Sequence, residues 1–228
     1  MSVKDNLNEI VSEIKEAKKR ANRDDDVLLL SVTKTVDYDL IDESIEWGVR
    51  DIGENKVQDL LERINHYGDK LNYHFIGTLQ RNKVKDIIGK VKLIHSVDSL
   101  RLAKEIDKRA KNIDVIQDCL IQVNVSKEES KSGVYLEDLE DFVYNILELS
   151  NIKIRGLMTM APYEANEEEL REIFQSLHDA FISIKNKNIK QLDMDYLSMG
   201  MSGDFEIAIE HGANIVRVGS KIYGKRNY

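Results

Sequence analysis

Lys34 is the residue of this sequence that is best placed for covalent chemistry. It follows a continuous apolar run, Val27-Leu28-Leu29-Leu30-Ser31-Val32-Thr33, of the kind found in strands that are buried on both faces. Desolvation at the end of such a strand disfavours the charged ammonium, and a neutral amine is the form that attacks an aldehyde. A lysine that extends its charged end to water explains the position equally simply. Imine chemistry at Lys34 therefore needs support from a second feature.

That second feature is a pair of glycine-bearing loops near the end of the chain. The segment Ser198-Met199-Gly200-Met201-Ser202-Gly203-Asp204 precedes a helix expected from about Phe205, and Val218-Gly219-Ser220 precedes Ile222-Tyr223-Gly224. Glycines let the backbone approach an anion closely, and N–H groups at a helix start complement its charge. Ser202 and Ser220 add hydroxyl donors. Ordinary turns with capping serines are the alternative, but together the loops predict a phosphate site. A phosphate-bearing aldehyde joined to Lys34 would use both features.

Two further polar residues could bind the ring of such a ligand. Arg217 precedes Gly219 by two residues, so both point to the same face of a strand, and its guanidinium could donate to a ring nitrogen. Because arginine stays protonated, it would leave a pyridine nitrogen unprotonated and weaken the ring as an electron sink. The alternative is an inward charge paired with a neighbouring acid. Asn55 could reach the ring, or it could cap a helix that begins near Lys56.

The elements that must position these residues alternate between strand and helix. After an amphipathic helix over Val3–Arg20, the sequence predicts eight strands, each followed by a helix or helical turn; they are expected at 27–33, 49–53, 73–77, 93–97, 120–125, 152–159, 196–199 and 215–219. Alternation with this count indicates a parallel sheet. No GxGxxG follows the first strand to support an open dinucleotide-binding sheet. We therefore expect a single (β/α)8 barrel, an α/β TIM barrel with an extra N-terminal helix, whose active site lies at the carboxyl ends of the strands.

Bulk composition limits the class of protein. The chain has 228 residues, a net charge of −8 and one cysteine. The acidic balance argues against broad nucleic-acid binding, and no spacing typical of a metal site occurs. Neither a signal peptide nor a membrane span is indicated at the level of sequence. We expect one domain over residues 1–228, a cytoplasmic location and, because a closed barrel leaves no sheet edge, a monomer.

The sequence resembles the YggS/PROSC family of pyridoxal phosphate homeostasis proteins, which are similar to the barrel domain of alanine racemase. The resemblance covers nearly the whole chain. The matching segments are Ser31-Val32-Thr33-Lys34-Thr35, Gly53-Glu54-Asn55-Lys56-Val57-Gln58, His74-Phe75-Ile76-Gly77-Thr78-Leu79-Gln80-Arg81-Asn82-Lys83, Val123-Asn124-Val125-Ser126, Ser130-Lys131-Ser132-Gly133, Arg155-Gly156-Leu157-Met158, Leu197-Ser198-Met199-Gly200-Met201-Ser202 and Val216-Arg217-Val218-Gly219-Ser220. So many matches in order are far more specific than any one motif.

The resemblance implies a site, a cofactor and a role. The cofactor is pyridoxal 5′-phosphate, held as an imine on Lys34; the other residues implied in binding it are Asn55, Met199, Met201, Ser202, Arg217, Gly219 and Ser220. It implies no catalytic residue and no metal, and a protein that binds, buffers and hands over the vitamer, with apo-forms of pyridoxal phosphate enzymes as possible recipients. Lys56 and Thr78 stand where family members often have Tyr and Pro, which affects only the rim of the pocket. Lys131 is a second lysine of interest, or simply a solvated one.

Two enzymatic alternatives can be weighed against a carrier. An amino-acid racemase needs bases on both faces of its substrate, and in alanine racemase the second is a tyrosine from an additional β domain and the partner subunit. No such domain is expected after Gly224, and Arg217 as ring partner stabilises a carbanion poorly. An aldolase acting on a sugar phosphate would need carboxylates at the mouth, where Glu54 is the only evident candidate. The sequence favours the carrier.

Overall fold

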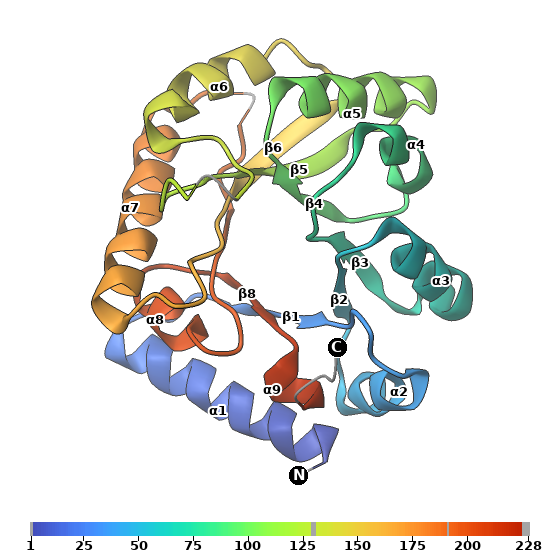
Figure 1. Ribbon diagram of the computed structural model, residues 1–228, viewed down its shortest axis with the longest axis vertical. Coiled ribbons are helices and arrows are strands. Elements are labelled where there is room, and N and C mark those ends of the chain that lie inside the picture. Colours follow the sequence, from blue (N-terminus) through green and yellow to red (C-terminus); the bar gives the residue numbers. More distant parts are fainter. Residues whose placement is uncertain (1, 129–130, 191, 225–228) are drawn as a thin grey trace.

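A closed barrel of eight parallel strands forms the centre of the molecule (Figure 1). The computed structural model describes residues 2–128, 131–190 and 192–224. The strands follow one another around the barrel in chain order, and β8 pairs with β1 to close it. Their bounds are β1 Leu28–Val32, β2 Asp51–Glu54, β3 Asn72–Phe75, β4 Leu93–Val97, β5 Gln117–Gln122, β6 Ile152–Met158, β7 Tyr196–Ser198 and β8 Ile215–Val218. The TIM barrel expected from the sequence is confirmed.

Helices surround the strands, as Figure 1 shows. Their bounds are α1 Val3–Arg20, α2 Tyr38–Trp47, α3 Val57–Tyr67, α4 Val84–Ile87, α5 Leu100–Asn112, α6 Leu139–Ile146, α7 Glu167–Asn186, α8 Phe205–Glu210 and α9 Ser220–Tyr223. Short 3-10 turns occupy Gly68–Lys70, Arg81–Lys83 and Leu136–Asp138. The last of these leads directly into α6. In the part of the chain described, no helix has the length and apolar character needed to cross a bilayer.

Successive side chains of each strand point alternately into the barrel and out toward the helices, so the apolar residues form two layers. The barrel interior is filled by a small cluster, Leu30, Val32, Ile76, Leu93, Leu120, Met158 and Ile215. A larger cluster fills the space between the strands and the helices. Because parallel strands are covered on both faces, their sequences are apolar on both, as the run before Lys34 illustrates.

Helix α1 is the addition to the eight repeated units. It begins with a capping box, in which Ser2 and Asp5 bond to one another's backbone N–H, and it buries Leu7, Ile10 and Ala17 along one stripe. This stripe packs against α2, α8 and α9. Figure 1 shows α1 lying along the outside of the barrel beside α8 and α9, the helices that follow the last two strands.

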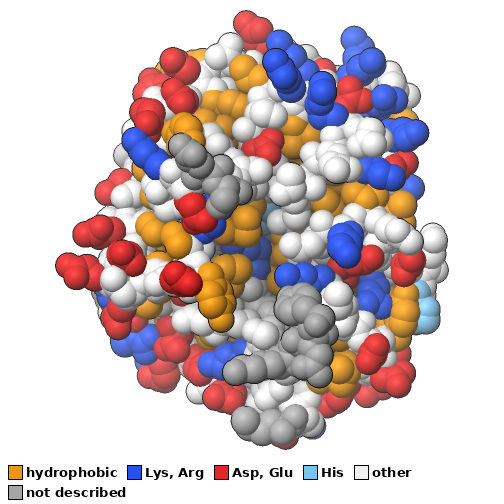
Figure 2. Space-filling view, in the orientation of Figure 1, with side chains coloured by type: hydrophobic (Ala, Val, Ile, Leu, Met, Phe, Trp, Pro, Cys, Tyr) orange, Lys and Arg blue, Asp and Glu red, His pale blue; other side chains and the backbone are white. Residues whose placement is uncertain are grey.

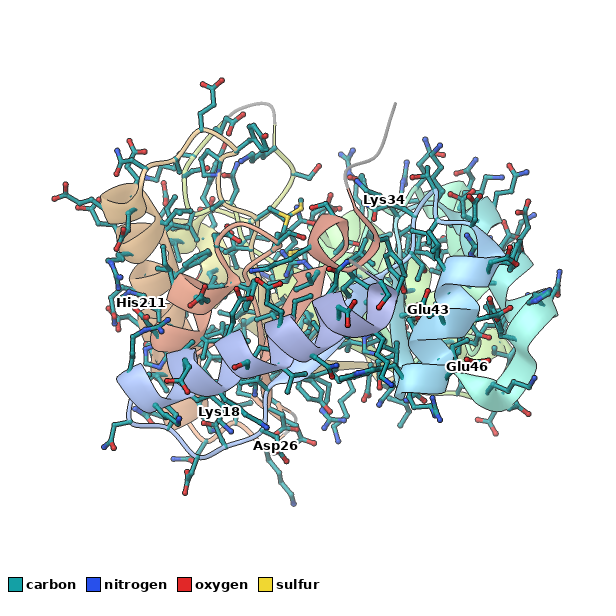
Figure 3. The ribbon with its side chains drawn as sticks, turned by 90° about the horizontal axis from the view of Figure 1, so that it is seen from below. Lys18, Asp26, Lys34, Glu43, Glu46 and His211 are labelled. Carbon is teal, nitrogen blue, oxygen red and sulfur yellow. The ribbon has the colours of Figure 1, made fainter. Side chains whose placement is uncertain are left out.

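The carboxyl ends of the strands open on one side of the barrel, which we call the mouth. In Figure 3, Lys34 lies at the upper side of the molecule, whereas Asp26, which precedes β1, lies at the opposite side. The space-filling view in Figure 2 looks onto the mouth and shows a hollow near its centre, with basic side chains inside it. The residues singled out from the sequence can therefore be located relative to this opening.

Candidate functional site

Lys34 stands on a tight turn at the end of β1. The Val36 N–H donates to the Thr33 carbonyl over 3.1 Å, and Thr35 takes a left-handed conformation with φ of 57°, which is uncommon for a β-branched residue. Lys34 itself is half-buried and lies two residues beyond Val32, whose side chain packs inside the barrel. The turn therefore presents the lysine at the mouth, as its place after the apolar run predicts.

The two glycine-bearing loops meet through Ser202. Its hydroxyl oxygen accepts the backbone N–H groups of Gly219 at 3.2 Å and Lys221 at 3.3 Å. Gly200, which precedes Ser202, has φ of +90°, and a Cβ there would lie 2.6 Å from the Ala208 Cβ of α8, so only glycine fits. Ser220 is exposed at the start of α9. The structure thus brings together the three residues expected at a phosphate site.

Arg217 lies inside the barrel on β8, the strand next to β1. Its backbone pairs with Leu30, and only 4% of the residue is exposed. The guanidinium donates to the Ser198 Oγ and to the Thr159 carbonyl, each over 2.8 Å. These hydrogen-bond partners are neutral. Among the described residues the acid considered from the sequence forms no ion pair with the guanidinium, although the charge of nearby Asp204 opposes the effect of burial on the pKa of Arg217. Burial lowers the pKa of Arg217 to about 10, which still leaves it protonated at neutral pH.

A buried chain of hydrogen bonds continues from Arg217 across the barrel. The Ser198 Oγ lies 3.0 Å from the His95 Nδ1, and the His95 Nε2 lies 3.0 Å from the His74 Nδ1. The His74 Nε2 then lies 3.1 Å from Asp51 Oδ1, which also binds Lys92 at 3.2 Å. Neither histidine was singled out as a site residue from the sequence. Their positions on the neighbouring strands β3 and β4 are the signal that could have indicated a contact between them.

Asn55 offers an acceptor with nothing yet bonded to it. Its side-chain Oδ1 is buried and has no hydrogen-bond partner among the described residues. The residue before α3 is Lys56, and no side chain caps that helix, so the capping alternative for Asn55 is not observed. A Cβ on Gly77 would lie 2.1 Å from the Asn55 carbonyl oxygen, so the loops after β2 and β3 pack closely here. Because a buried acceptor without a partner is costly, Asn55 fits a site that a ligand donor completes.

Met199 is the one expected site residue that faces elsewhere. Its neighbour Ser198 points into the barrel toward Arg217, and Met199 is fully buried in the outer layer between strands and helices. The expectation that its side chain lines the pocket is therefore corrected, because adjacent strand residues point to opposite faces. Met201, in the loop itself, is half-buried.

Glu54 and Lys131, the other two charged residues considered from the sequence, are both engaged by other side chains. The Glu54 carboxylate is wholly buried and accepts the Thr33 hydroxyl over 2.6 Å; burial raises its pKa, against the opposing effects of Thr33 and Arg63. It therefore does not serve as the solvent-facing acid of an aldolase.

Lys131 forms an ion pair with Glu128 at 3.0 Å in the loop after β5. No cluster of metal-ligating side chains occurs within residues 2–128, 131–190 and 192–224.

Taken together, the fold and the site define a TIM barrel with a lysine and two glycine-bearing loops, joined through Ser202, at its mouth. The family described as alanine racemase, N-terminal domain, matches residues 6–227. A relative from Aquifex aeolicus (strain VF5), named pyridoxal phosphate homeostasis protein, is 43% identical over 100% of both chains. One of the same name from Escherichia coli (strain K12) is 35% identical over 98% of this chain and 96% of its own. The chain therefore belongs to the alanine racemase N-terminal domain family and, within it, to the pyridoxal phosphate homeostasis proteins.

Solved structures agree with this assignment. An unknown protein from Bifidobacterium adolescentis is 34% identical, covers 97% of this chain and 94% of its own, and has a TM-score of 0.90. PipY from Synechococcus elongatus, in a structure with pyridoxal phosphate bound, is 28% identical over 98% of this chain and 100% of its own, with a TM-score of 0.85. An alanine racemase from Clostridium difficile shares the fold alone, at 16% identity and a TM-score of 0.73.

Proposed function

We propose that this protein binds pyridoxal 5′-phosphate through an imine on Lys34 and acts in vitamin B6 homeostasis as a non-catalytic carrier or buffer in the cytoplasm. The observation that carries the proposal is the meeting of Lys34, the Ser202 loop pair and Arg217 at one mouth, in a family whose relatives bear that name. Recipients would be apo-forms of pyridoxal phosphate enzymes. A closed barrel, which needs no second sheet, supports a monomer.

The side chains at the mouth suit the parts of this cofactor. Ser202, Gly219 and Ser220 would bind the phosphate, with hydroxyl and backbone N–H donors. The unpartnered Asn55 Oδ1 would accept from the ring hydroxyl, and Met201 would contact the ring from the loop. Arg217 would face the ring nitrogen with N–H groups beyond those given to Ser198 and Thr159. When bound, the cofactor supplies an electrophilic aldehyde and, in enzymes, an electron sink.

The environment of Arg217 favours a protein that binds the cofactor without catalysing a reaction. The guanidinium stays protonated, so it donates to a ring nitrogen and gives it no proton. A ring nitrogen without a proton withdraws electrons weakly. Glu54, the nearest candidate acid in the sequence, is engaged by Thr33 in the outer layer. These features favour storage of the vitamer over racemisation.

Binding is tested with purified protein. We expect the wild type to be yellow after incubation with pyridoxal phosphate, with imine absorbance in the visible range that borohydride removes. Lys34→Ala should weaken binding by at least about tenfold and lose that absorbance, because the covalent bond is lost. Lys18→Ala, on the far side of the molecule (Figure 3), is the control and should match the wild type. A colourless wild type that takes up no cofactor would refute the proposal.

The absence of catalysis is tested separately. The loaded protein, given L-alanine and other amino acids, should produce D-enantiomer and keto-acid no faster than pyridoxal phosphate alone at the same concentration. Chiral chromatography measures the first product and a coupled dehydrogenase the second. Turnover that is well above this control and lost in Lys34→Ala would show an enzyme in place of a carrier.

A further inference from the structure

The turn that carries Lys34 is bonded at both of its ends to two buried charged residues. At its start, the Thr33 hydroxyl donates to the Glu54 carboxylate over 2.6 Å. At its end, the Val36 carbonyl accepts from the Arg63 guanidinium over 2.5 Å. Glu54 comes from the end of β2 and Arg63 from the middle of α3. Both contacts lie behind the mouth, in the layer between strands and helices.

The two charged residues also contact each other and the next helix. The Arg63 Nε lies 3.6 Å from Glu54 Oε1, and the guanidinium stacks over the Tyr38 ring at 4.2 Å from its centre. Tyr38 begins α2, the element that follows the turn. Arg63 therefore joins the end of the turn to the start of α2, while Glu54 ties its beginning to β2.

This arrangement is expensive for a purely structural role. Glu54 is 0% exposed and Arg63 only 7% exposed, and the Glu54 Oε2 and Arg63 Nε have no hydrogen-bond partner among the described residues. Apolar side chains of similar volume commonly stabilise a buried site as well as an ion pair does. What an apolar pair could not supply is the acceptor for Thr33 and the donor for Val36. Those two bonds hold a turn whose Thr35 is left-handed.

We propose that Glu54 and Arg63 are positioning residues that fix the Thr33–Val36 turn and thereby the direction of the Lys34 side chain. This inference rests on the proposed function, since it assigns a purpose to the direction of Lys34. Both residues are buried behind the turn. They act through Thr33 and Val36, and a lysine held in one direction forms its bond without first ordering the turn.

The first test uses the protein without cofactor. Thr33→Val keeps the shape of the side chain and removes the donor to Glu54, whereas Thr33→Ser keeps the donor. We expect backbone amide exchange in the peptide around Lys34 to rise by about tenfold in Thr33→Val and to stay near the wild-type rate in Thr33→Ser. A rise of equal size throughout the barrel would mean a merely structural role and would overturn the inference.

The second test reads the bound cofactor. Thr33→Val and Glu54→Leu, which remove the donor and the acceptor of the same bond, should each raise the apparent Kd for pyridoxal phosphate by about tenfold and reduce the circular dichroism of the imine band, which reports a fixed chromophore. Thr33→Ser should restore both. Asp118→Asn removes one of the two carboxylate partners of Arg155, a half-buried ion pair near the start of β5, and should change neither.

The outcomes separate the two proposals. If the wild type forms no Lys34 adduct after borohydride reduction and peptide mass analysis, the proposed function fails. If the wild type forms the adduct and both variants match it in affinity and dichroism, the binding function stands and the positioning role of Glu54 and Arg63 is overturned. Arg63→Lys keeps the charge without the planar fork and is expected to behave like Glu54→Leu.

Discussion

At the scale of single residues, the buried chain from Arg217 to Asp51 has a definite direction. Arg217 can only donate, so Ser198 accepts from it and has its own proton to give to the His95 Nδ1. Asp51 can only accept, because His74 and Lys92 lower its pKa to about 2 although burial opposes this. His74 must therefore donate from Nε2, and its Nδ1 must accept from the His95 Nε2. Both rings are neutral Nε2–H tautomers, and every proton points away from Arg217.

This assignment predicts how stability depends on pH. Burial lowers the pKa of His74 and of His95 below the ordinary value of 6.5. Below pH 6.5 the unfolded chain therefore binds more protons than the folded one, so the free energy of unfolding falls as pH falls. The limiting slope is about 1.4 kcal/mol per pH unit for each histidine.

Urea unfolding at about pH 7, 6 and 5 measures that slope. His95→Gln should remove the contribution of one histidine, up to about 1.4 kcal/mol per pH unit, whatever it does to stability at neutral pH. Nitrogen-15 NMR of the wild type should show both rings as Nε2–H tautomers near pH 7. An unchanged slope in the variant, or a charged His95 at neutral pH, would contradict the assigned direction.

At the scale of elements, local sequence patterns predicted those helices and strands whose formation depends on residues close in the sequence. The apolar run before Lys34 predicted β1 closely, and the amphipathic stripe gave α1 its bounds. Strand β5 begins earlier than expected, at Gln117, where the buried Gln117 side chain donates to the Val91 carbonyl just before the neighbouring strand β4. A polar residue whose hydrogen-bond partner lies in another segment of the chain has no signature in its own segment.

In the candidate site, too, some positions could be predicted from the sequence and others could not. The position of Lys34 at the mouth could be predicted because it follows a strand end, and the same holds for Ser202, Gly219 and Ser220. Met199 was misplaced because β7 is only three residues long, too short for its alternation to show which side chain faces inward. The partners of Thr33 and Val36 could not be foreseen, since Arg63 is 27 residues from the carbonyl it binds.

At the scale of the whole molecule, α1 connects the beginning of the chain to the elements of the site. It packs against α8 and α9, which follow the two glycine-bearing loops, and against α2, which follows the Lys34 turn. The Asn6 amide donates to the Ile222 carbonyl in α9 over 2.7 Å. Trp47, the single tryptophan, donates from α2 to Asn8 of α1 over 2.9 Å. A helix that bridges the first and last units should unfold together with the barrel.

Ile10→Ala tests this cooperativity. Ile10 is fully buried in α1, so its truncation should lower the free energy of unfolding by about 2–5 kcal/mol, from lost burial and the cavity left behind. Urea transitions followed by Trp47 fluorescence and by far-ultraviolet circular dichroism should still coincide, since α1 and the barrel form one unit. Ile116→Ala, at a side chain that is 64% exposed, should cost under about 0.5 kcal/mol. A fluorescence transition at clearly lower urea than the dichroism transition would instead mean that α1 detaches first, and the site loops would then lose their support before the barrel opens.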